Sequence, residues 1–562
     1  MLALRHPPRL TVLALALAAV LCAHAADEPT IDFTVVESDT LRGLSNSVLT
    51  SPTAWREVAK LNRLPDANRI TPGQVLKIPT RLLRADTRDA RVVSTQGEVR
   101  VGDSAASDGQ GVKEGQSVQT GPRSSAVLEL ADGSRVRLPP SSLAQVMASR
   151  QLGERTDVPN AASPAAAGSA GVANGWFVGT MRVVRGSVEV FATKVLRAKP
   201  LEVVTPTAVV GVRGTRYRVS VDEAVEGRTR GEVVEGLVRF DLPRHSTGTD
   251  LPAGFGAVSD ASVAGGTNAP AAVRLQAAPD LAGIPSRFER PLVRFALPAE
   301  TVPLHVQVAR DEAFDKIVVD QQVAAGEEVR IAGLDDASWH LRARRVDGLG
   351  LEGLDAQRAF VLKARPEPPI YNAPRSNAKQ QIGPVAFAWA QNVAAPQARL
   401  QIAEDEAFTR IVEQRVGLDG PGASETLTRP GVYYWRLASV RPNGDAGPYG
   451  DPQRFELRPQ PEPPTAGRSA DGNSLIFKWG GRPQDKQRVE LARDPAFTEI
   501  VAQDEVNAAE WVLPKPSRGG RYYFRYRSIE PDGYTTPYSE VAMVEVPRDW
   551  SLWLLLLPLV LL

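Results

Sequence analysis

The feature that most constrains this chain is an internal repeat. The stretch "VARDEAFDKIVVD" at residues 308–320 returns as "IAEDEAFTRIVEQ" at 402–414, and again as "LARDPAFTEIVAQ" at 491–503. The copies lie 403 − 309 = 94 and 492 − 403 = 89 residues apart, which is the length of a compact β-sandwich domain. An apolar run precedes each copy and an aromatic-rich run follows it. We therefore expect three β-sandwich repeats, at 281–364, 366–459 and 464–547.

The repeated motif has adjacent acids before a phenylalanine in two of its three copies. The third copy has Pro495 in place of Glu312 and Glu406, which excludes a ligand or catalytic role common to all three. Proline suits the first residue of a helical turn whose preceding aspartate caps the exposed amides. We interpret the aspartates as caps and the phenylalanines as core plugs, with the following Ile/Val pair buried on the next strand. These residues are Asp311, Asp405 and Asp494, then Phe314, Phe408 and Phe497.

Proline-rich stretches at 364–374 and 458–467 separate the repeats, and we expect them to act as semi-stiff spacers. The repeated frame resembles fibronectin type III-like domains of bacterial secreted and surface proteins. The first repeat is the least regular, because it has His340 and Leu341 where the others have bulky aromatics and arginine.

Length and charge bound the rest of the chain. A chain of 562 residues is far longer than one hydrophobic core supports, so about four to five domains are expected. The 66 basic and 65 acidic residues nearly cancel, which leaves no overall field to attract a polyanion. Nucleic acid is therefore not an expected partner.

Residues 1–25 have the pattern of a secretory signal peptide. A basic start precedes the apolar run at 10–21, and Ala23-His24-Ala25 forms a small-residue cleavage site. The single cysteine, Cys22, lies inside this segment, with Ala19 where a lipoprotein signal usually has leucine. Lipidation is thus disfavoured, and the exported chain is expected to fold without disulfides.

The last 13 residues, 550–562, are strongly apolar. As a helix they would span about 20 Å, short of the roughly 30 Å hydrocarbon slab of a bilayer. Two interpretations stay open: a hydrophobic tail that packs or inserts partway, or a membrane-attachment or sorting segment. The first of these gives weak membrane contact.

Residues 31–80 predict a strand, two helices and a closing strand. A β-rich run at 33–36 is followed by Ser38 and Asp39, which can cap a helix starting near Thr40. Ser51-Pro52 can start the second helix, with Trp55, Val58 and Leu61 along one face, and a turn at 71–74 precedes the strand at 75–78.

The phrases "FTVxxxDTL", "LN", "NRI" and "PGQxLxIP" in this stretch resemble the LysM domain, a βααβ module. That resemblance implies binding to the N-acetylglucosamine chains of peptidoglycan or chitin. By position, the sugar groove would lie between two loops formed by Asp39, Thr40, Leu41, Asn68, Arg69, Ile70 and Pro72. One departure is Ser38, where the family usually has glycine. A LysM fold kept as a spacer or protein-contact module is the alternative.

Residues 90–245 change to short alternating strands, which predicts an all-β domain. Asp132-Gly133 between two such runs predicts a hairpin with a two-residue type I′ turn. An Ala/Ser/Gly-rich insertion at about 149–175 is expected to be a mobile loop. The phrases "LELADGSRVRLPPSS" and "VVTPTAVVGVRGTRYRVSV" resemble the FecR domain, which implies an extracytoplasmic β fold and protein contact.

Two further patterns bear on chemistry. "GVRGT" at 211–215 lacks the lysine and spacing of a phosphate loop, so we interpret it as a tight turn with a structural or partner-binding Arg213. Outside the signal segment the histidines are His245, His305 and His340, too scattered to predict a metal site or a catalytic triad. No catalytic residue, metal or cofactor is expected.

The sequence thus predicts a multidomain, mainly β, non-enzymatic protein of the periplasm or cell envelope. It would bind peptidoglycan through the LysM-like module and contact an envelope protein through the FecR-like domain and the repeats. Two alternatives remain. One is an accessory of FecR-type transmembrane signalling that senses an outer-membrane partner, and the other is a cell-wall hydrolase with an unrecognised site, which zymography would reveal.

Overall fold

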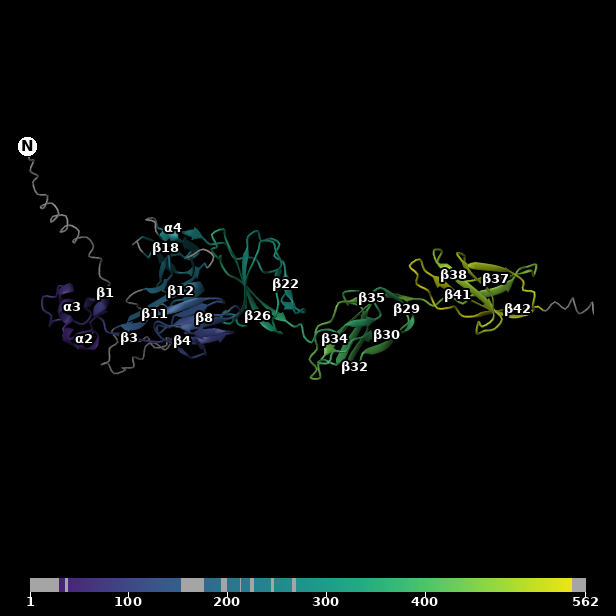
Figure 1. Cartoon of the computed structure of the whole chain (residues 1–562), viewed down its shortest axis with the longest axis horizontal. Coiled ribbons are helices and arrows are strands. Elements are labelled where there is room, and N and C mark those ends of the chain that lie inside the picture. Colours follow the sequence, from purple (N-terminus) through teal and green to yellow (C-terminus); the bar gives the residue numbers. More distant parts are fainter. Residues whose placement is uncertain are drawn as a thin grey trace, which may run out of the picture. The chain divides into compact units, whose positions relative to one another are not determined.

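The computed structural model describes residues 30–35, 39–152, 176–193, 200–212, 214–222, 227–243, 247–264 and 269–547. It divides into two compact units, Met1–Leu362 and Lys363–Leu562, drawn in Figure 1 from purple to teal and from green to yellow. The predicted signal peptide and C-terminal tail lie outside the described residues, as do Ser38, Arg213, His245 and residues 153–175 of the predicted mobile insertion.

The N-terminal module has the predicted strand–helix–helix–strand order. Its elements are β1 Thr30–Thr34, α2 Leu41–Ser47, α3 Trp55–Leu61 and β2 Val75–Pro79, with β1 antiparallel to β2. Thr40 caps α2 in place of the predicted Ser38 or Asp39, because its side chain accepts a hydrogen bond from Gly43 N at 3.0 Å.

The second helix begins later than predicted. Residues 51–54 form a turn, with Ala54 N donating to Ser51 O, so α3 starts at Trp55 rather than at Pro52. Of its predicted apolar face, Val58 is fully buried, whereas Leu61 is 45% exposed. The helix ends at Leu61, so that side chain projects beyond the core.

The module joins the next domain without a free linker. After β2, the 3₁₀ turn η1 Thr80–Leu82 is tied back to the module by Thr50 N donating to Leu82 O and Arg84 N to Val48 O. Leu152, from the following domain, is buried in the hydrophobic cluster of the module. The two domains therefore share apolar packing.

The second domain is a closed β-barrel of strands β3 to β20. Its first strands are β3 Ala85–Thr87, β4 Ala90–Gln96, β5 Val99–Val101, β6 Ser104–Ala105, β7 Gly111–Val112, β8 Ser117–Thr120, β9 Ser125–Glu129, β10 Arg135–Leu138 and β11 Leu143–Leu152. They continue with β12 Trp176–Phe191, β13 Leu201–Val204, β14 Val209–Val212, β15 Arg216–Val221, β16 Thr229–Glu235, β17 Leu237–Asp241, β18 Gly248–Pro252, β19 Phe255–Ser259 and β20 Val273–Arg274. A short helix, α4 Ala261–Ala264, precedes β20, and alternating apolar side chains fill the interior.

One local prediction for this domain is wrong in detail. The β9–β10 hairpin forms, but Arg135 pairs with Glu129, so its loop is longer than two residues. Gly133 has φ +78, while Asp132 instead accepts hydrogen bonds from Ser134. The apolar run at 232–240 forms two strands, β16 and β17, because the chain turns at Gly236 with φ +86.

Each of the three repeats is a pair of packed sheets. The first has sheets β21-β27-β26-β23-β24 and β22-β25, with strands β21 Arg287–Phe288, β22 Val293–Phe295, β23 Leu304–Ala309, β24 Ile317–Val323, β25 Val329–Ile331, β26 Ala337–Arg345 and β27 Ala356–Leu362. The predicted apolar and aromatic runs thus face each other across the sandwich.

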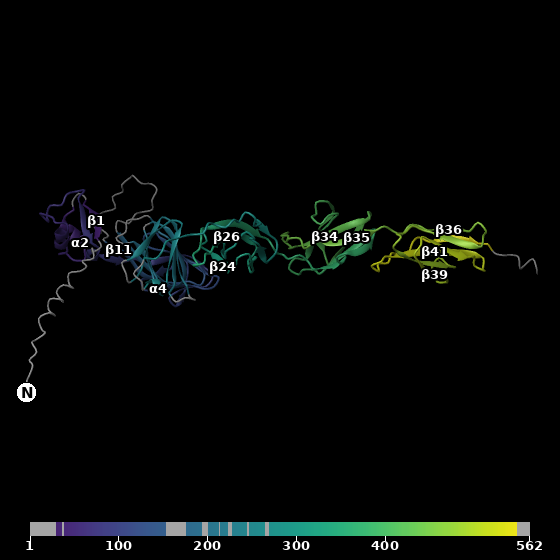
Figure 2. The ribbon, with the colours of Figure 1, turned by 90° about the horizontal axis from the view of Figure 1, so that it is seen from above.

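The second and third repeats share this arrangement. The second pairs β28-β30-β33 with β29-β35-β34-β31-β32, from β28 Tyr371–Ala373, β29 Ala378–Gln381, β30 Gly383–Trp389, β31 Gln397–Ala403, β32 Ile411–Asp419, β33 Gly422–Leu427, β34 Gly431–Val440 and β35 Gln453–Arg458. The third pairs β36-β37-β40 with β39-β38-β41-β42, from β36 Thr465–Arg468, β37 Ser474–Lys478, β38 Lys486–Ala492, β39 Ile500–Val506, β40 Glu510–Pro514, β41 Gly520–Ile529 and β42 Ala542–Val546. Figure 2 shows β34 beside β35 in the second sandwich.

The repeated motif forms a β-turn, not the predicted helical turn. In each copy the phenylalanine N–H donates to the carbonyl of the aspartate three residues earlier, and the phenylalanine has φ of 61°, 57° or 58°. Each aspartate carboxylate accepts from the amides four and five residues later, so it bonds backbone amides as predicted, but these amides follow the turn instead of starting a helical turn. The phenylalanines are buried as predicted, at 0%, 6% and 7% exposure for Phe314, Phe408 and Phe497.

The Ile/Val pair after the motif is buried only in part, contrary to the prediction. Ile317 is fully buried in the first repeat, but the pairs of the second and third repeats are 40–45% exposed. In every copy the pair spans a β-bulge on an edge strand. In the first repeat the barrel contacts this edge, because Ile317 N donates a hydrogen bond to Ser125 Oγ of β9.

The proline-rich stretches are parts of the sandwiches rather than spacers. In the second unit, Glu367 O accepts from Ser439 Oγ at 2.7 Å, and Tyr371 Oη accepts from Leu437 N at 3.0 Å. Likewise Glu462 O accepts from Tyr526 Oη at 3.0 Å. These contacts fix both stretches against sandwich strands.

Candidate functional site

The two loops that are predicted to form the sugar groove flank the β1–β2 pair of the LysM-like module. Gly73 N donates to Val35 O and Val35 N to Gln74 O, both at 2.8 Å, which holds the end of β1 beside the turn before β2. Val35, at the end of β1, and the turn before β2 are therefore neighbours.

The seven predicted groove residues divide by exposure. Thr40, Asn68, Arg69 and Pro72 are exposed, and Asp39 and Ile70 are half-buried. Leu41 is 1% exposed within the hydrophobic cluster, so its side chain supports the loop and is not offered to a ligand. The assignment of these seven residues to a sugar groove stays a prediction.

A second site, which sequence reasoning missed, is a buried cluster of charges between the barrel and the first sandwich. Its centre is Glu189 on β12, 2% exposed. Its carboxylate accepts from Arg137 at 2.6 Å, from Arg216 at 2.7 Å and from Arg342 of the sandwich at 3.3 Å. Burial opposes ionisation, but Arg342 and Arg137 hold the pKa of Glu189 well below its usual range.

At the edge of this cluster, side chains of the barrel strands make hydrogen bonds to the motif turn of the first repeat. Arg137 also donates to the Asp315 carboxylate and, at 2.5 Å, to Ala313 O. Ser125 Oγ donates to Asp315 O and accepts from Ile317 N, each at 2.9 Å. The motif turn is thus the point at which the sandwich contacts the barrel.

A second group of charges completes the contact. Asp355 of the sandwich bonds Arg344 at 2.5 Å and Arg218 of the barrel at 3.2 Å. Arg218 also donates to the carbonyls of Glu352 and Gly353, each at 2.8 Å. Burial opposes the ionisation of Asp355, but the charges of Arg344 and Arg342 outweigh burial and lower the pKa of Asp355 to about 2. We call the whole contact the barrel–sandwich joint.

The three repeats place an arginine at the same strand position, over the ring of the motif phenylalanine. Strand pairing aligns His340 with Tyr434 and Tyr523, so the first repeat lacks the aromatics at this place as predicted, but it keeps the arginine as Arg342. The stacked pairs are Arg342 over Phe314 at 4.4 Å, Arg436 over Phe408 at 3.9 Å and Arg525 over Phe497 at 3.9 Å.

What distinguishes the first repeat is the second neighbour of that arginine. Tyr449 covers Arg436 at 4.4 Å and Tyr538 covers Arg525 at 3.8 Å, closing a cation–π stack. In the first repeat Asp355 approaches Arg342 at 3.9 Å instead, and Arg342 reaches Glu189 of the barrel. A carboxylate has replaced an aromatic ring where the sandwich meets the barrel.

His305, which sequence analysis left without a role, lies between two carboxylates of the first sandwich. Its Nε2 is 2.7 Å from Asp320 and its Nδ1 is 2.8 Å from Glu352. Both ring nitrogens must donate if both acids are ionised, so the geometry favours the imidazolium. Burial opposes that charge, but Glu352 and Asp320 outweigh it and raise the pKa of His305 to about 10.

Because the folded pKa of His305 exceeds the unfolded value of 6.5, its stabilisation is complete below pH 6.5 and is lost as the pH rises toward 10. We expect the melting temperature of the first unit to fall over this range, with a shallower fall in His305→Gln. Melting curves of the two proteins at matched pH test this, and parallel slopes would contradict it. His340→Gln, at a half-buried position on β26, is the control.

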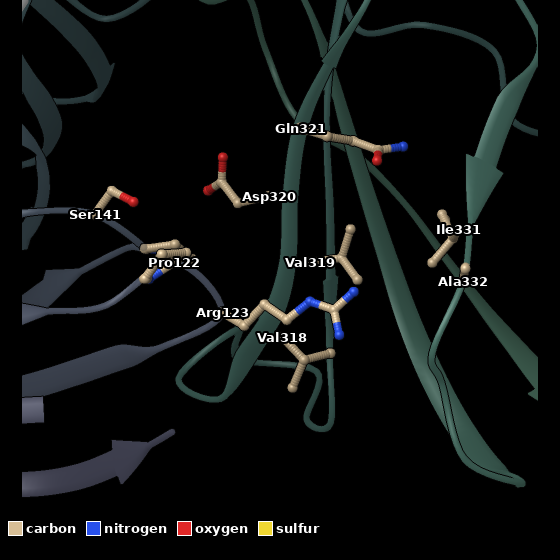
Figure 3. Close-up of a pocket in the computed structure, with 10 residues that line it drawn as sticks. Pro122, Arg123, Ser141, Val318, Val319, Asp320, Gln321, Ile331 and Ala332 are labelled. Atoms are coloured by element: carbon tan, nitrogen blue, oxygen red, sulfur yellow. The ribbon is translucent and has the colours of Figure 1, made fainter. Parts of the chain in front are cut away.

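A cavity of about 300 Å³ opens beside the joint. Figure 3 shows Arg123 reaching from a barrel loop across it, with Val319 and Ile331 of the sandwich beyond and Ser141 at the barrel side. Asp320 lines the cavity while its oxygens accept from His305 and Gln307, at 2.7 and 2.6 Å.

In the described ranges, no group of three or more His, Cys, Asp and Glu side chains is arranged to hold a metal ion. Of the helices within those ranges, none has the length and apolar character needed to cross a membrane.

Comparison with solved structures finds fibronectin-type modules. The FN1–FN3 domains of chicken CNTN1 are 11% identical, cover 46% of this chain and 95% of their own, and have a TM-score of 0.20. The fibronectin(III)-like modules of Clostridium thermocellum CbhA are 11% identical, cover 31% and 92%, and also have a TM-score of 0.20. The sandwich fold of the repeats rests on their own strand pairing.

Comparison with families and curated proteins gives two partial matches. No curated protein matches the chain. Residues 33–79 match the family described as LysM domain, and residues 173–239 match FecR protein. The chain is therefore similar to a LysM domain and then to a FecR protein, in the order that its sequence motifs predict.

Proposed function

We propose that this chain is a non-enzymatic protein of the bacterial cell envelope that binds peptidoglycan and presents the FecR-like barrel and the sandwiches for protein contact. The observation that carries the proposal is the LysM match over residues 33–79, together with the neighbouring loops of that module. Exposed polar side chains at Thr40 and Asn68, together with half-buried Ile70, suit an uncharged N-acetyl sugar.

The joint supports the second part of the proposal. The barrel and the first sandwich are linked by buried, multiply bonded charges, and Leu152 links the barrel to the LysM-like module. A sugar-binding module packed on the barrel in this way would hold the barrel at the cell wall.

The direct test is sedimentation of the full chain with insoluble peptidoglycan beside a form lacking residues 31–80. We expect the full chain in the pellet and the deleted form in the supernatant. Recovery of both in the supernatant would contradict wall binding. Because the deletion uncovers Leu152, the deleted form should first be shown to be monodisperse.

The FecR match favours a second candidate, in which the barrel senses an outer-membrane partner and passes its state to a transmembrane signalling protein. Cross-linking in cells separates the two candidates. A partner with a cytoplasmic segment favours signalling, whereas capture of wall-associated proteins alone favours the first proposal.

A further inference from the structure

Two buried carboxylates at the barrel–sandwich joint have opposite surroundings. Glu189 accepts hydrogen bonds from three arginines. Glu232, on β16, is equally buried at 2% exposure, but its nearest cation is Arg218, with Nε 3.4 Å from Oε2. Arg218 Nε makes no hydrogen bond within the described ranges, so this contact is an ion pair without a hydrogen bond.

The remaining groups around Glu232 give it little compensation. Glu352 N donates to its Oε1 at 3.2 Å. The Glu352 carboxylate is itself a nearby negative charge, held by His305 and by Arg344 at 2.6 Å. Arg218 is already engaged with Asp355 and two carbonyls. A buried carboxylate with so little hydrogen bonding takes up a proton in preference to staying charged.

We propose that the barrel–sandwich joint is a proton-dependent clasp, closed when Glu232 carries a proton and weakened when Glu232 is ionised. The proposal concerns regulation and does not depend on peptidoglycan binding. It would make the barrel surface that the first sandwich covers accessible in response to the pH around the protein, because opening the joint would uncover that surface.

The direction of the pH dependence follows from the surroundings. Burial raises the pKa of Glu232 to about 7, with the charges of Arg218 and Arg344 and the Glu352 amide opposing the rise and the Glu352 carboxylate adding to it. An exposed glutamate has the ordinary value of 4.5. Closing the joint therefore takes up a proton on Glu232 near neutral pH. Proton uptake stabilises the closed joint, and this stabilisation of the joint is lost as the pH rises through 7. For one such proton, the ratio of closed to open joint falls about tenfold from pH 6 to pH 8.

The other acids of the joint do not contribute in this window. Surrounding positive charges lower the pKa of Glu189, Glu352, Asp355 and Asp320 against the effect of burial, so these groups stay ionised between pH 6 and pH 8. His305 lies between Asp320 and Glu352 of the same sandwich, and opening the joint leaves that contact in place.

The experiment measures how often the joint opens. Cys22 is the only cysteine, so a Cys22→Ser background carries a single reporter thiol in Ser125→Cys, which is fully buried at the joint. The rate of its labelling by a thiol reagent is compared with and without Glu232→Gln, at pH 6 and at pH 8. Comparing the two proteins at the same pH cancels the pH dependence of the thiol itself.

At each pH, the labelling rate of the protein that keeps Glu232 is divided by the labelling rate of the Glu232→Gln protein. We expect this ratio to rise about tenfold from pH 6 to pH 8. Glu235→Gln, exposed on the same strand, should leave the labelling rate unchanged at both pH values. A ratio constant within twofold for Glu232→Gln would overturn the proposal. Ile317→Cys, fully buried on the sandwich side, gives an independent reporter if Ser125→Cys disturbs the joint.

Discussion

Replacing Glu189 by glutamine is expected to destabilise the barrel–sandwich joint by about 3–5 kcal/mol, because removing one partner leaves uncompensated buried charge. Three arginines donate hydrogen bonds to this one carboxylate. Two of them, Arg137 and Arg342, are only 4% and 2% exposed. Glutamine keeps the size of the side chain but loses the negative charge. The protected amides of β12 and β26 report the loss as faster hydrogen exchange in the full chain.

A surface ion pair on the same barrel is the matched control. Glu129 on β9 faces Arg91 and Arg135 at 3.3 and 3.4 Å, with a side chain that is 28% exposed. Exposed pairs of this kind contribute only about 0–1 kcal/mol, so Glu129→Gln should leave the exchange of both strands nearly unchanged. Equal effects of the two substitutions would mean that the buried cluster does not stabilise the joint.

The second large effect is expected at the motif turn of the second sandwich. Phe408→Ala should cost about 3–5 kcal/mol, as the truncation of a buried aromatic side chain. Its ring is 6% exposed and lies 3.9 Å beneath the guanidinium of Arg436, so the substitution removes both core packing and a cation–π contact. Thermal unfolding of the second unit measures the change.

Glu406→Pro is the companion substitution at the same turn and should change stability by less than about 0.5 kcal/mol, as surface substitutions usually do. Glu406 is exposed, and Pro495 already occupies the equivalent position of the third repeat. Proline also suits the second residue of such a turn. A larger loss from Glu406→Pro than from Phe408→Ala would give the acids of the motif a role that the structure does not.

Much of the fold could be predicted because local sequence patterns indicate it. The spacing of three motif copies indicated three sandwiches. Pro495 in the third copy indicated that the preceding aspartate, and not the acid after it, is the residue that the turn requires. The same logic failed on geometry: the phenylalanines adopt positive φ, which residue type alone does not indicate. The predicted burial of the Ile/Val pair was wrong in two repeats, because that burial depends on whether another domain covers the edge strand.

The joint could not be predicted, since its charges come from segments far apart in sequence. Glu189 meets Arg342 across 153 residues, and Arg137 meets Asp315 across 178. One local signal was present. Asp355 stands in the first repeat where the others have tyrosine, a loss of an aromatic that could have indicated a polar contact.

The sugar groove was predicted by resemblance and stays a prediction, and among its seven residues Leu41 has a buried side chain. Half-buried Ile70 then becomes the apolar residue of the pair of loops most able to contact a sugar ring. We therefore expect a charge introduced there to weaken peptidoglycan binding more than a charge on α3 of the same module.

The most direct measurement of the central claim is therefore sedimentation of full-length Ile70→Asp with insoluble peptidoglycan, beside Leu61→Asp. Leu61 is an exposed leucine on α3 of the same module, so the two substitutions are matched in charge. We expect Ile70→Asp to lower the bound fraction at least tenfold and Leu61→Asp to bind as the unmodified chain does. Full binding by a correctly folded Ile70→Asp protein would contradict the groove, and no binding by the unmodified chain would contradict the wall-binding function itself.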